Sequence, residues 1–557
     1  MHNFPRTFRR RLRLNAMTTV QRRLGTPLGP TSEALQTEQL FEHTGRWLFN
    51  EETNKRLRHS PFNAEALEAI ACRVTEARGI TNWTKIGEGS NKVFRLELDN
   101  GRKVVLRIPN PIVPNVELTT ASEVATMEYV RERFGVPEGT ASHFPVPPKV
   151  LAWDRSPTND VGSAYIIHEF VEGVPAMDWW LSDFQRPVSK ILWNVFSLEK
   201  ALLEEPFALY GSLYFKEDVE EKDRDQPLYS DEQHAAKYPA LAAKYRSGPS
   251  TDRQWWRDVY GKVEGIDRGP WPNVESILRS AISLQLKAIE TGVAFQNPHI
   301  RSKPQDAPNL TRLLNMLLTT VDYLVPADRR HTRPALNHPS LTAKDMITNA
   351  NGEDGLVGII DWQGAAILPF THQTRVPTLF RAFRVGKQDE ADELRTMNME
   401  NCLEARSRIY GNLVASKMPD RTAHFVHKLS MTNMLHNILR TVSDGGHGLR
   451  GILADLSINW WAIVQASGKQ ALYNPIPLSM AEIFAIEAES TREEAIDQFK
   501  NDTTFWMKCD IWGAISDEEY EEGKNAMAVV QAICEDPSTS KPCDWPFYDG
   551  CWAMDLC

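Results

Sequence analysis

The sequence lacks the features by which membrane proteins and nucleic-acid-binding proteins are usually recognised. It contains no apolar run of about 18 residues, the length that a membrane-spanning helix needs, so no membrane span is predicted. It also lacks an excess of positive charge, because its formal net charge is −10 and its pI is about 5.9. Binding to a nucleic-acid backbone needs a basic surface, so we expect no nucleic acid as the main partner.

The seven cysteines lack the spacing of a disulfide framework or of a metal centre. Their number is odd and no Cys-x-x-Cys pair occurs, which fits a reducing compartment better than a disulfide-rich fold. Four of them follow residue 530, where histidine is absent. Free thiols or a single disulfide are therefore favoured in this tail over a metal site.

Acidic residues are absent from the first 32 residues, which carry seven arginines, and the first carboxylate is Glu33. An arginine-rich, acid-free start is typical of a mitochondrial presequence, or transit peptide. The alternative is a disordered basic tail or a nuclear-type cluster, since Arg9, Arg10 and Arg11 are consecutive. We favour a presequence over residues 1–32 and expect a mitochondrial location.

The length of 557 residues predicts two or more lobes, because one compact core of ordinary size would be too small. Residues 33–79 have the pattern of a helical extension, and residues 80–172 that of a small strand-rich lobe. Residues 173–535 are mainly helical in pattern, and residues 536–557 form a tail with Cys, Pro and Trp. Residues 217–255 are charged and show no clear periodicity, which predicts a surface insertion.

Alternating apolar and polar residues predict the strands, and a period near 3.6 predicts one helix among them. The helix covers residues 120–134, and an Asp-Asn-Gly turn at 99–101 predicts a hairpin. The predicted strands are residues 83–86, 92–98, 103–108, 149–153, 164–170, 345–348 and 356–362. The last two form a second hairpin, well separated in sequence from the first.

A short glycine-containing segment joins the first two of these strands, with Gly87, Gly89, Ser90 and Asn91. Glycine lets backbone N–H groups approach a phosphate closely, so such a segment can hold a nucleotide. Taken alone, it is more often only a turn between strands. Its meaning depends on which residues follow it and in what order.

The residues that follow have the order of a phosphoryl-transfer site. Arg107 lies on the third strand, and Glu123 lies at the centre of the apolar face of the next helix. A carboxylate there is costly unless it has a partner, and Arg107 is the candidate. Much later come His338 and a hairpin that ends at Asp361. A kinase site has the same parts in the same order: a glycine loop, a cation, an acidic residue on the next helix, a catalytic loop and an aspartate that binds metal. Singly, each could be structural: a salt bridge, a buried histidine or a strand-end cap.

Longer stretches carry a more specific resemblance: residues 41–50, 86–109, 119–127, 146–153, 210–215, 269–271 and 336–369. Over these stretches the chain resembles the aminoglycoside phosphotransferase family, which is protein-kinase-like. Within that family it is most similar to the fungal subfamily of altered inheritance of mitochondria protein 9. The resemblance implies an α/β (α+β), protein-kinase-like two-lobed fold. It has a small antiparallel-sheet N-lobe, a large mainly helical C-lobe and a catalytic-loop region at 336–369.

The resemblance also implies ATP and Mg²⁺ as cofactors, and assigns roles to particular residues. Arg107 stands where kinases keep the phosphate-binding lysine, with Glu123 as its helix partner. Glu169 and Val171 fall in the linker whose backbone holds adenine, and Asp361 matches the aspartate that binds magnesium. The partners implied are the nucleotide and an unidentified small-molecule acceptor or protein.

The catalytic loop departs from the family pattern, which is His, any residue, Asp, four residues, Asn. Here it has His338, Ser340 in place of the base, and Asp345 in place of Asn. Asp345 can still bind magnesium through oxygen. Ser340 cannot accept a proton at neutral pH, and a general base contributes about 10²–10⁴-fold. We expect a weakly active phosphotransferase or a pseudokinase. The alternatives are an active ATP-dependent small-molecule kinase and a non-catalytic mitochondrial interaction module.

Overall fold

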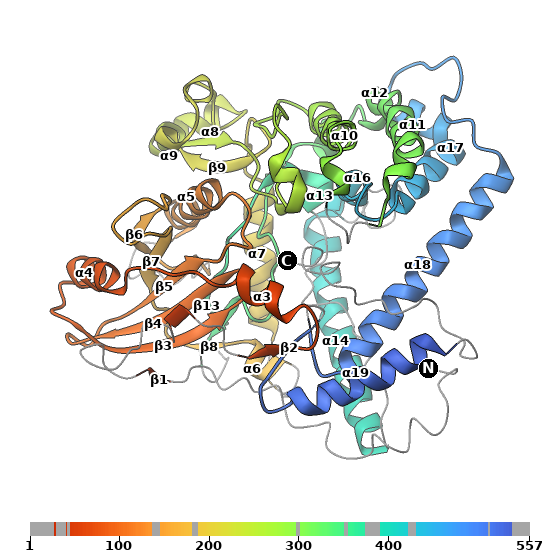
Figure 1. Cartoon of the computed structure of the whole chain (residues 1–557). Coiled ribbons are helices and arrows are strands. Elements are labelled where there is room, and N and C mark those ends of the chain that lie inside the picture. The colour runs from red at the N-terminus through yellow and green to blue at the C-terminus, as the bar shows by residue number, and fades with distance from the viewer. Residues whose placement is uncertain are drawn as a thin grey trace.

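The computed structural model describes residues 27–28, 40–41, 45–135, 145–180, 186, 188–296, 301–349, 355–373, 390–421, 431–510 and 513–536. The chain forms a small lobe built on an antiparallel sheet and a larger, mainly helical lobe (Figure 1). The predicted fold class is therefore confirmed. The predicted presequence and the tail beyond residue 536 lie almost entirely outside the described residues, so they stay predictions.

The small-lobe sheet has the order β1-β3-β4-β5-β7-β6, and each neighbouring pair is antiparallel. Its strands are β1 (Pro27–Leu28), β3 (Ile80–Glu88), β4 (Asn91–Leu98), β5 (Lys103–Pro109), β6 (Val150–Asp154) and β7 (Tyr165–Glu169). Phe94, Leu96 and Leu98 alternate with half-buried residues along β4, as expected of a strand with one face against a core. The sheet positions Arg107 on β5, opposite Val93 of β4.

Two helices of the extension and one of the lobe itself surround this sheet. The extension supplies α3 (Glu51–Leu57) and α4 (Ala64–Thr75), and α4 buries Leu67 and Ala71 in the core that contains Phe94. Asn63 caps α4 as predicted, since its side chain accepts a hydrogen bond from the backbone N–H of Ala66 at 3.1 Å. The third helix, α5 (Val116–Phe134), carries Glu123.

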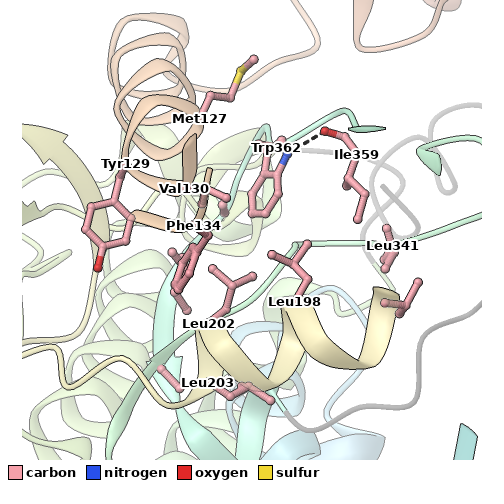
Figure 2. Packing of buried hydrophobic residues seen from close by; sticks show 14 of the residues in the cluster. Met127, Tyr129, Val130, Phe134, Leu198, Leu202, Leu203, Leu341, Ile359 and Trp362 are labelled. Carbon is pink, nitrogen blue, oxygen red and sulfur yellow. Dashed lines mark hydrogen bonds between the residues drawn. The ribbon is translucent and has the colours of Figure 1, made fainter. Parts of the chain in front are cut away.

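The apolar stripe of α5 packs against the large lobe. Figure 2 shows Val130 and Phe134 of α5 beside Leu198 and Leu202 of α7 (Ser189–Leu203), with Trp362 close by. All five are buried in one core that spans both lobes. The helix that carries Glu123 is therefore held by packing against the large lobe.

The catalytic-loop region lies between short strands of the large lobe. Residues 337–345 connect β11 (Pro334–Leu336) to β12 (Met346–Thr348), which pairs with β13 (Leu356–Ile359) and with β8 (Val174–Pro175). β11 pairs with β14 (Ile367–Pro369) after the chain has passed Asp361. Met346 is opposite Ile359, so the two ends of the hairpin that carry Asp345 and Asp361 meet.

The prediction of a surface insertion at residues 217–255 is wrong. The segment contains α8 (Glu232–Lys237), α9 (Pro239–Lys244) and β10 (Tyr245–Gly248), which pairs with β9 (Ser212–Phe215). It buries Val219, Leu228, Tyr229, Leu241 and Tyr245. Each short element contributes only one or two of these side chains, so no period appears in the sequence. The segment packs on α5, where Lys244 pairs with Glu128 and Glu132.

The large lobe has further helices, some of which form a second core with α10 (Val274–Glu290). They are α6 (Met177–Trp180), α11 (Ala307–Leu318), α12 (Val321–Leu324), α13 (Phe370–Gln373), α14 (Glu390–Lys417), α16 (Met431–Leu439), α17 (His447–Ser467), α18 (Met480–Trp506) and α19 (Tyr520–Glu535). After α18, β15 (Ala514–Ile515) pairs with β2 (Arg46–Trp47) of the extension (Figure 1). Within the described part of the chain, no helix has the length and apolarity needed to cross a membrane.

Candidate functional site

An arginine held between two carboxylates is the centre of the candidate site. The Arg107 guanidinium donates to Glu123 of α5 through Nη1, and to Asp361 through Nη2 at 2.8 Å from Oδ1. The Arg107 and Glu123 side chains are 8% and 1% exposed, whereas that of Asp361 is 56% exposed. The pairing that the buried position of Glu123 predicted is present. It joins the sheet, α5 and the end of β13.

The charges in this cluster do not balance. Burial acts to lower the pKa of Arg107, but Glu123 and Asp361 outweigh it, so this pKa is raised and the guanidinium stays charged. Burial raises the pKa of Glu123 to about 7, with Arg107 opposing the rise and Asp361 adding to it. Two carboxylates thus share one cation. An anionic ligand placed here would need further positive charge.

The backbone at Asp361 is strained, and His338 contacts it. Asp361 has φ 67°, in the left-handed region that non-glycine residues seldom occupy. The buried His338 ring donates from Nε2 to the backbone carbonyl of Ile360 at 3.0 Å and lies edge-on to Trp362. Burial lowers the pKa of His338 to about 4, so the imidazole is neutral at pH 7. The structure thus places His338 under the Asp361 turn, as a support for it.

Asp345, which directly precedes β12, lies near Asp361, which follows β13. Its Oδ2 accepts hydrogen bonds from the backbone N–H and the hydroxyl of Thr342, at 2.8 and 2.7 Å, and its carbonyl accepts from the N–H of Ile360. Burial, together with the nearby Asp361 carboxylate, raises the pKa of Asp345 to about 7. Two oxygen donors that repel each other fit a hard divalent cation.

A closed protein cage for a metal is absent from the described residues, which contain no cluster of three or more His, Cys, Asp or Glu side chains suited to one. Magnesium does not need such a cage, because it is usually held by one or two carboxylates, substrate phosphates and water. The donor set of Asp345 and Asp361 therefore fits magnesium.

Ser340 is exposed, two residues after the buried His338. Its hydroxyl is uncharged at neutral pH, so it offers no carboxylate at the position where the resemblance predicts the base. The loop thus places His338 and Asp345 in buried positions and Ser340 at the surface.

The glycine segment forms the tip of the β3–β4 hairpin. Gly87 lies in β3, where an added Cβ would come within 3.3 Å of Val93, while at Gly89 it would meet nothing within 4 Å. The Asn110 side chain donates to the Gly89 carbonyl at 2.8 Å, and its backbone N–H donates to that of Ser90 at 2.8 Å. The hairpin tip is thus held by the end of β5, with open space at Gly89.

Two residues that sequence reasoning missed connect this hairpin to the large lobe. The Gln363 side chain exchanges hydrogen bonds with Asn91 at 3.0 and 3.3 Å and also bonds to Glu123. Arg253 donates from Nη2 to the Ser90 hydroxyl at 2.9 Å and to Oε1 of Gln363 at 3.1 Å. Gln363 could have been found from its place two residues after Asp361. Arg253 falls in the segment with no clear pattern, so no signal pointed to it.

Glu169 and Val171 lie where the small lobe joins the large lobe. Glu169 ends β7 and is exposed, and its carbonyl already contacts Nδ1 of His168 at 2.8 Å. Val171 packs beside Gly358 of β13, since a Cβ there would come within 3.1 Å of it. These two residues therefore lie at the connection between the lobes, apart from the contacts of the Arg107 cluster.

The antiparallel small lobe, the Arg107–Glu123 pair and the hairpin that ends at Asp361 define a protein-kinase-like α/β fold. Among known proteins, the chain is 31% identical over 327 residues to a subtelomeric hrmA-associated cluster protein of Aspergillus fumigatus, covering 53% of this chain and 59% of that protein. It is 24% identical over 399 residues to altered inheritance of mitochondria protein 9, mitochondrial, of Candida albicans, covering 62% and 61%. No family model matches the chain.

The Yarrowia lipolytica protein of the same name is 28% identical over 268 residues, covering 45% of this chain and 44% of that protein. The Candida and Yarrowia relatives confirm the resemblance found in the sequence, and both are named as mitochondrial, in agreement with the expected location. The chain spans 59% of the Aspergillus relative and 61% of the Candida relative. What the whole relatives do is therefore not carried over to it.

Solved structures of aminoglycoside phosphotransferases are also similar to the chain. One is APH(4)-Ia, at 13% identity and a TM-score of 0.35, covering 72% of this chain and 99% of that one. Another is a thermostable mutant of the same enzyme in a ternary complex with AMP-PNP and hygromycin B. It matches at 13% identity and a TM-score of 0.34, covering 73% of this chain and 100% of that one.

Proposed function

We propose that the chain binds ATP with magnesium between its lobes and transfers phosphate weakly or not at all. The observation that carries the proposal is the Arg107 guanidinium held by both Glu123 and Asp361, while Ser340 occupies the position of the base. The first feature is the machinery for placing a nucleotide, and the second removes a proton acceptor. Binding can therefore persist where turnover does not.

Each residue of the site has its own role in nucleotide binding. Asp345 and Asp361 would hold magnesium, which when bound neutralises charge on phosphate oxygens. Arg107 sits beside Asp361 and fixes its carboxylate at 2.8 Å. His338 supports the strained turn on which Asp361 stands. An added Cβ at Gly89 would meet nothing within 4 Å, so a phosphate can approach the backbone of the hairpin tip closely.

The loss of the base limits turnover without abolishing it. Phosphoryl transfer depends mainly on positioning and on charge stabilisation, and a general base adds about 10²–10⁴-fold. The exposed Ser340 offers a hydroxyl dipole and no charge. An acceptor hydroxyl would lose its proton to solvent, which is slower than transfer to a held carboxylate.

The test is nucleotide affinity with excess magnesium and with a chelator, measured by calorimetry in the wild type and in Asp361→Ala. We expect magnesium to tighten ATP binding in the wild type and to have little effect in the variant. Asp322→Ala is the matched control, because Asp322 is 60% exposed in a surface ion pair with Arg279. A wild type that binds no ATP, or an Asp361→Ala variant with full magnesium dependence, would contradict the proposal.

One observation favours a second candidate function, an active phosphotransferase acting on a small molecule. Burial raises the pKa of Asp345 to about 7, so this carboxyl group can take up and release a proton near neutral pH. If Asp345 served as the base, ATP turnover would reach ordinary kinase rates of about 1–100 per second despite Ser340. A turnover assay over a range of acceptor alcohols separates the two functions.

A further inference from the structure

A second arginine reaches the glycine hairpin from the large lobe. Arg253 begins the short 3₁₀ helix Arg253–Trp255, which Asp252 caps by accepting a hydrogen bond from the N–H of Gln254 at 3.0 Å. The next anchor is Trp255, which is fully buried and lies 4.8 Å from Trp271 between ring centroids. The Arg253 backbone is therefore fixed on a packed base, while its guanidinium extends to the Ser90 hydroxyl.

The partners of this guanidinium are neutral. Arg253 donates from one nitrogen to the oxygens of Ser90 and Gln363, and no ion pair of Arg253 occurs within the described part of the chain. Arg107 differs, because two carboxylates already engage it. A guanidinium has five N–H donors in a planar fork, and most of those of Arg253 are not used by these two bonds.

The charge balance of the site calls for such a cation. Arg107 is shared by Glu123 and Asp361, and Asp345 adds a third acidic group next to Asp361. An ATP polyphosphate would bring several negative charges into this surrounding. Magnesium at the two aspartates offsets part of that charge, and Arg253 supplies a cation at the hairpin tip through its contact with Ser90. Arg253 is half-buried at that tip, where a charge-assisted bond is stronger than in open solvent.

We infer that Arg253 is a phosphate-binding residue of the nucleotide site, supplied by the large lobe, and that it distinguishes ATP from the uncharged nucleoside. This inference rests on the proposed nucleotide binding. The Ser90 bond holds the guanidinium in place, and a bound phosphate takes the remaining N–H groups of the fork. The same contact draws the small-lobe hairpin and the large lobe together over the nucleotide.

The rival account is that Arg253 only closes the hairpin against the large lobe. In that case the Ser90 bond hinders nucleotide entry, and its loss would strengthen binding or leave it unchanged. The two accounts give opposite signs for the same substitution. Arg253→Gln keeps hydrogen-bonding capacity and removes the charge, so it separates charge from packing.

The experiment measures the dissociation constants of ATP and adenosine, at fixed excess magnesium, for the full chain and three variants. Arg253→Gln should weaken ATP binding by roughly tenfold, the effect of one charge-assisted phosphate contact worth about 1.4 kcal/mol, and should change adenosine binding less than twofold. The ATP affinity of Arg253→Lys should lie between those of the wild type and Arg253→Gln, because lysine keeps the charge and lacks the planar set of N–H donors. Arg279→Gln is the control, since Arg279 lies in an exposed surface pair.

Unchanged or tighter ATP binding in Arg253→Gln overturns the inference, and so does an equal loss for ATP and adenosine. If Arg253→Gln does not fold, the test rests on Arg253→Lys. If that variant binds ATP with the affinity and the salt dependence of the wild type, Arg253 makes no bidentate phosphate contact and the inference is wrong. A wild type that binds neither compound refutes the proposed function itself. A binding wild type with an indifferent Arg253→Gln refutes only the role of Arg253.

Discussion

Removing Arg107 should make the contribution of Glu123 to the stability of the protein depend on pH above pH 7, where in the wild type it does not. In Arg107→Met, Glu123 stays 1% exposed and loses the cation that opposes the rise of its pKa, so that pKa moves from about 7 to a higher value. Removing one partner of a buried ion pair costs about 3–5 kcal/mol when the remaining charge is kept. Here Glu123 can escape that cost by binding a proton.

The raised pKa of Glu123 determines whether stability rises or falls with pH. A carboxyl group whose folded-state pKa is raised stabilises the fold below its unfolded-state pKa, and this stability is lost as pH rises toward the folded-state pKa. In the wild type the loss from Glu123 ends near pH 7. In Arg107→Met it continues above pH 7, at about 1.4 kcal/mol per pH unit. The stability difference between the two proteins should therefore widen between pH 7 and pH 9.

The assay is urea unfolding of both proteins, followed by tryptophan fluorescence at several pH values. The double variant Arg107→Met, Glu123→Gln is the control, because it removes the titrating group; its difference from the wild type should not widen above pH 7. Glu123→Gln alone should be mild, since Arg107 keeps Asp361 as a partner. A constant difference between the wild type and Arg107→Met, or a double variant that shows the same widening, would refute the reasoning.

Three further predictions concern the catalytic loop, α5 and the N-terminus. Ser340→Asp should raise ATP turnover by part of the roughly 10²–10⁴-fold that a general base supplies. Ser340→Asn, whose side chain cannot accept a proton, should leave ATP turnover unchanged. Tyr129→Phe should destabilise the protein by about 1–2 kcal/mol in urea unfolding, because the hydroxyl of buried Tyr129 donates to buried Glu205 at 2.7 Å. Residues 1–32 fused to a fluorescent reporter should direct it to mitochondria, and a cytosolic reporter would contradict the presequence.

Local sequence patterns were enough to predict those parts of the fold that depend on a single segment of the chain. β4 was predictable because its alternation places Phe94, Leu96 and Leu98 on one buried face. The Arg107–Glu123 pair was predictable because a carboxylate on an apolar helix face requires a partner. In both cases the information lies within one element or between two neighbours in the sequence.

The rest depended on contacts between distant segments. Arg253 and Ser90 are 163 residues apart, and neither carries a pattern that points to the other. The role of His338 was visible only once its ring was placed against the Ile360 carbonyl, beneath the strained Asp361. The burial of the 217–255 segment came from short elements that each bury only one or two large apolar side chains. Such packing has no sequence period.

The central claim is that this protein binds a magnesium nucleotide and has lost most of its capacity to transfer phosphate. The most direct measurement combines ATP affinity with ATP turnover on one preparation of the unaltered chain, with magnesium and with a chelator. The account predicts magnesium-dependent binding together with turnover at least about 10²-fold below the ordinary kinase range of about 1–100 per second. Turnover within that range, or no binding of ATP at any magnesium concentration, would contradict it.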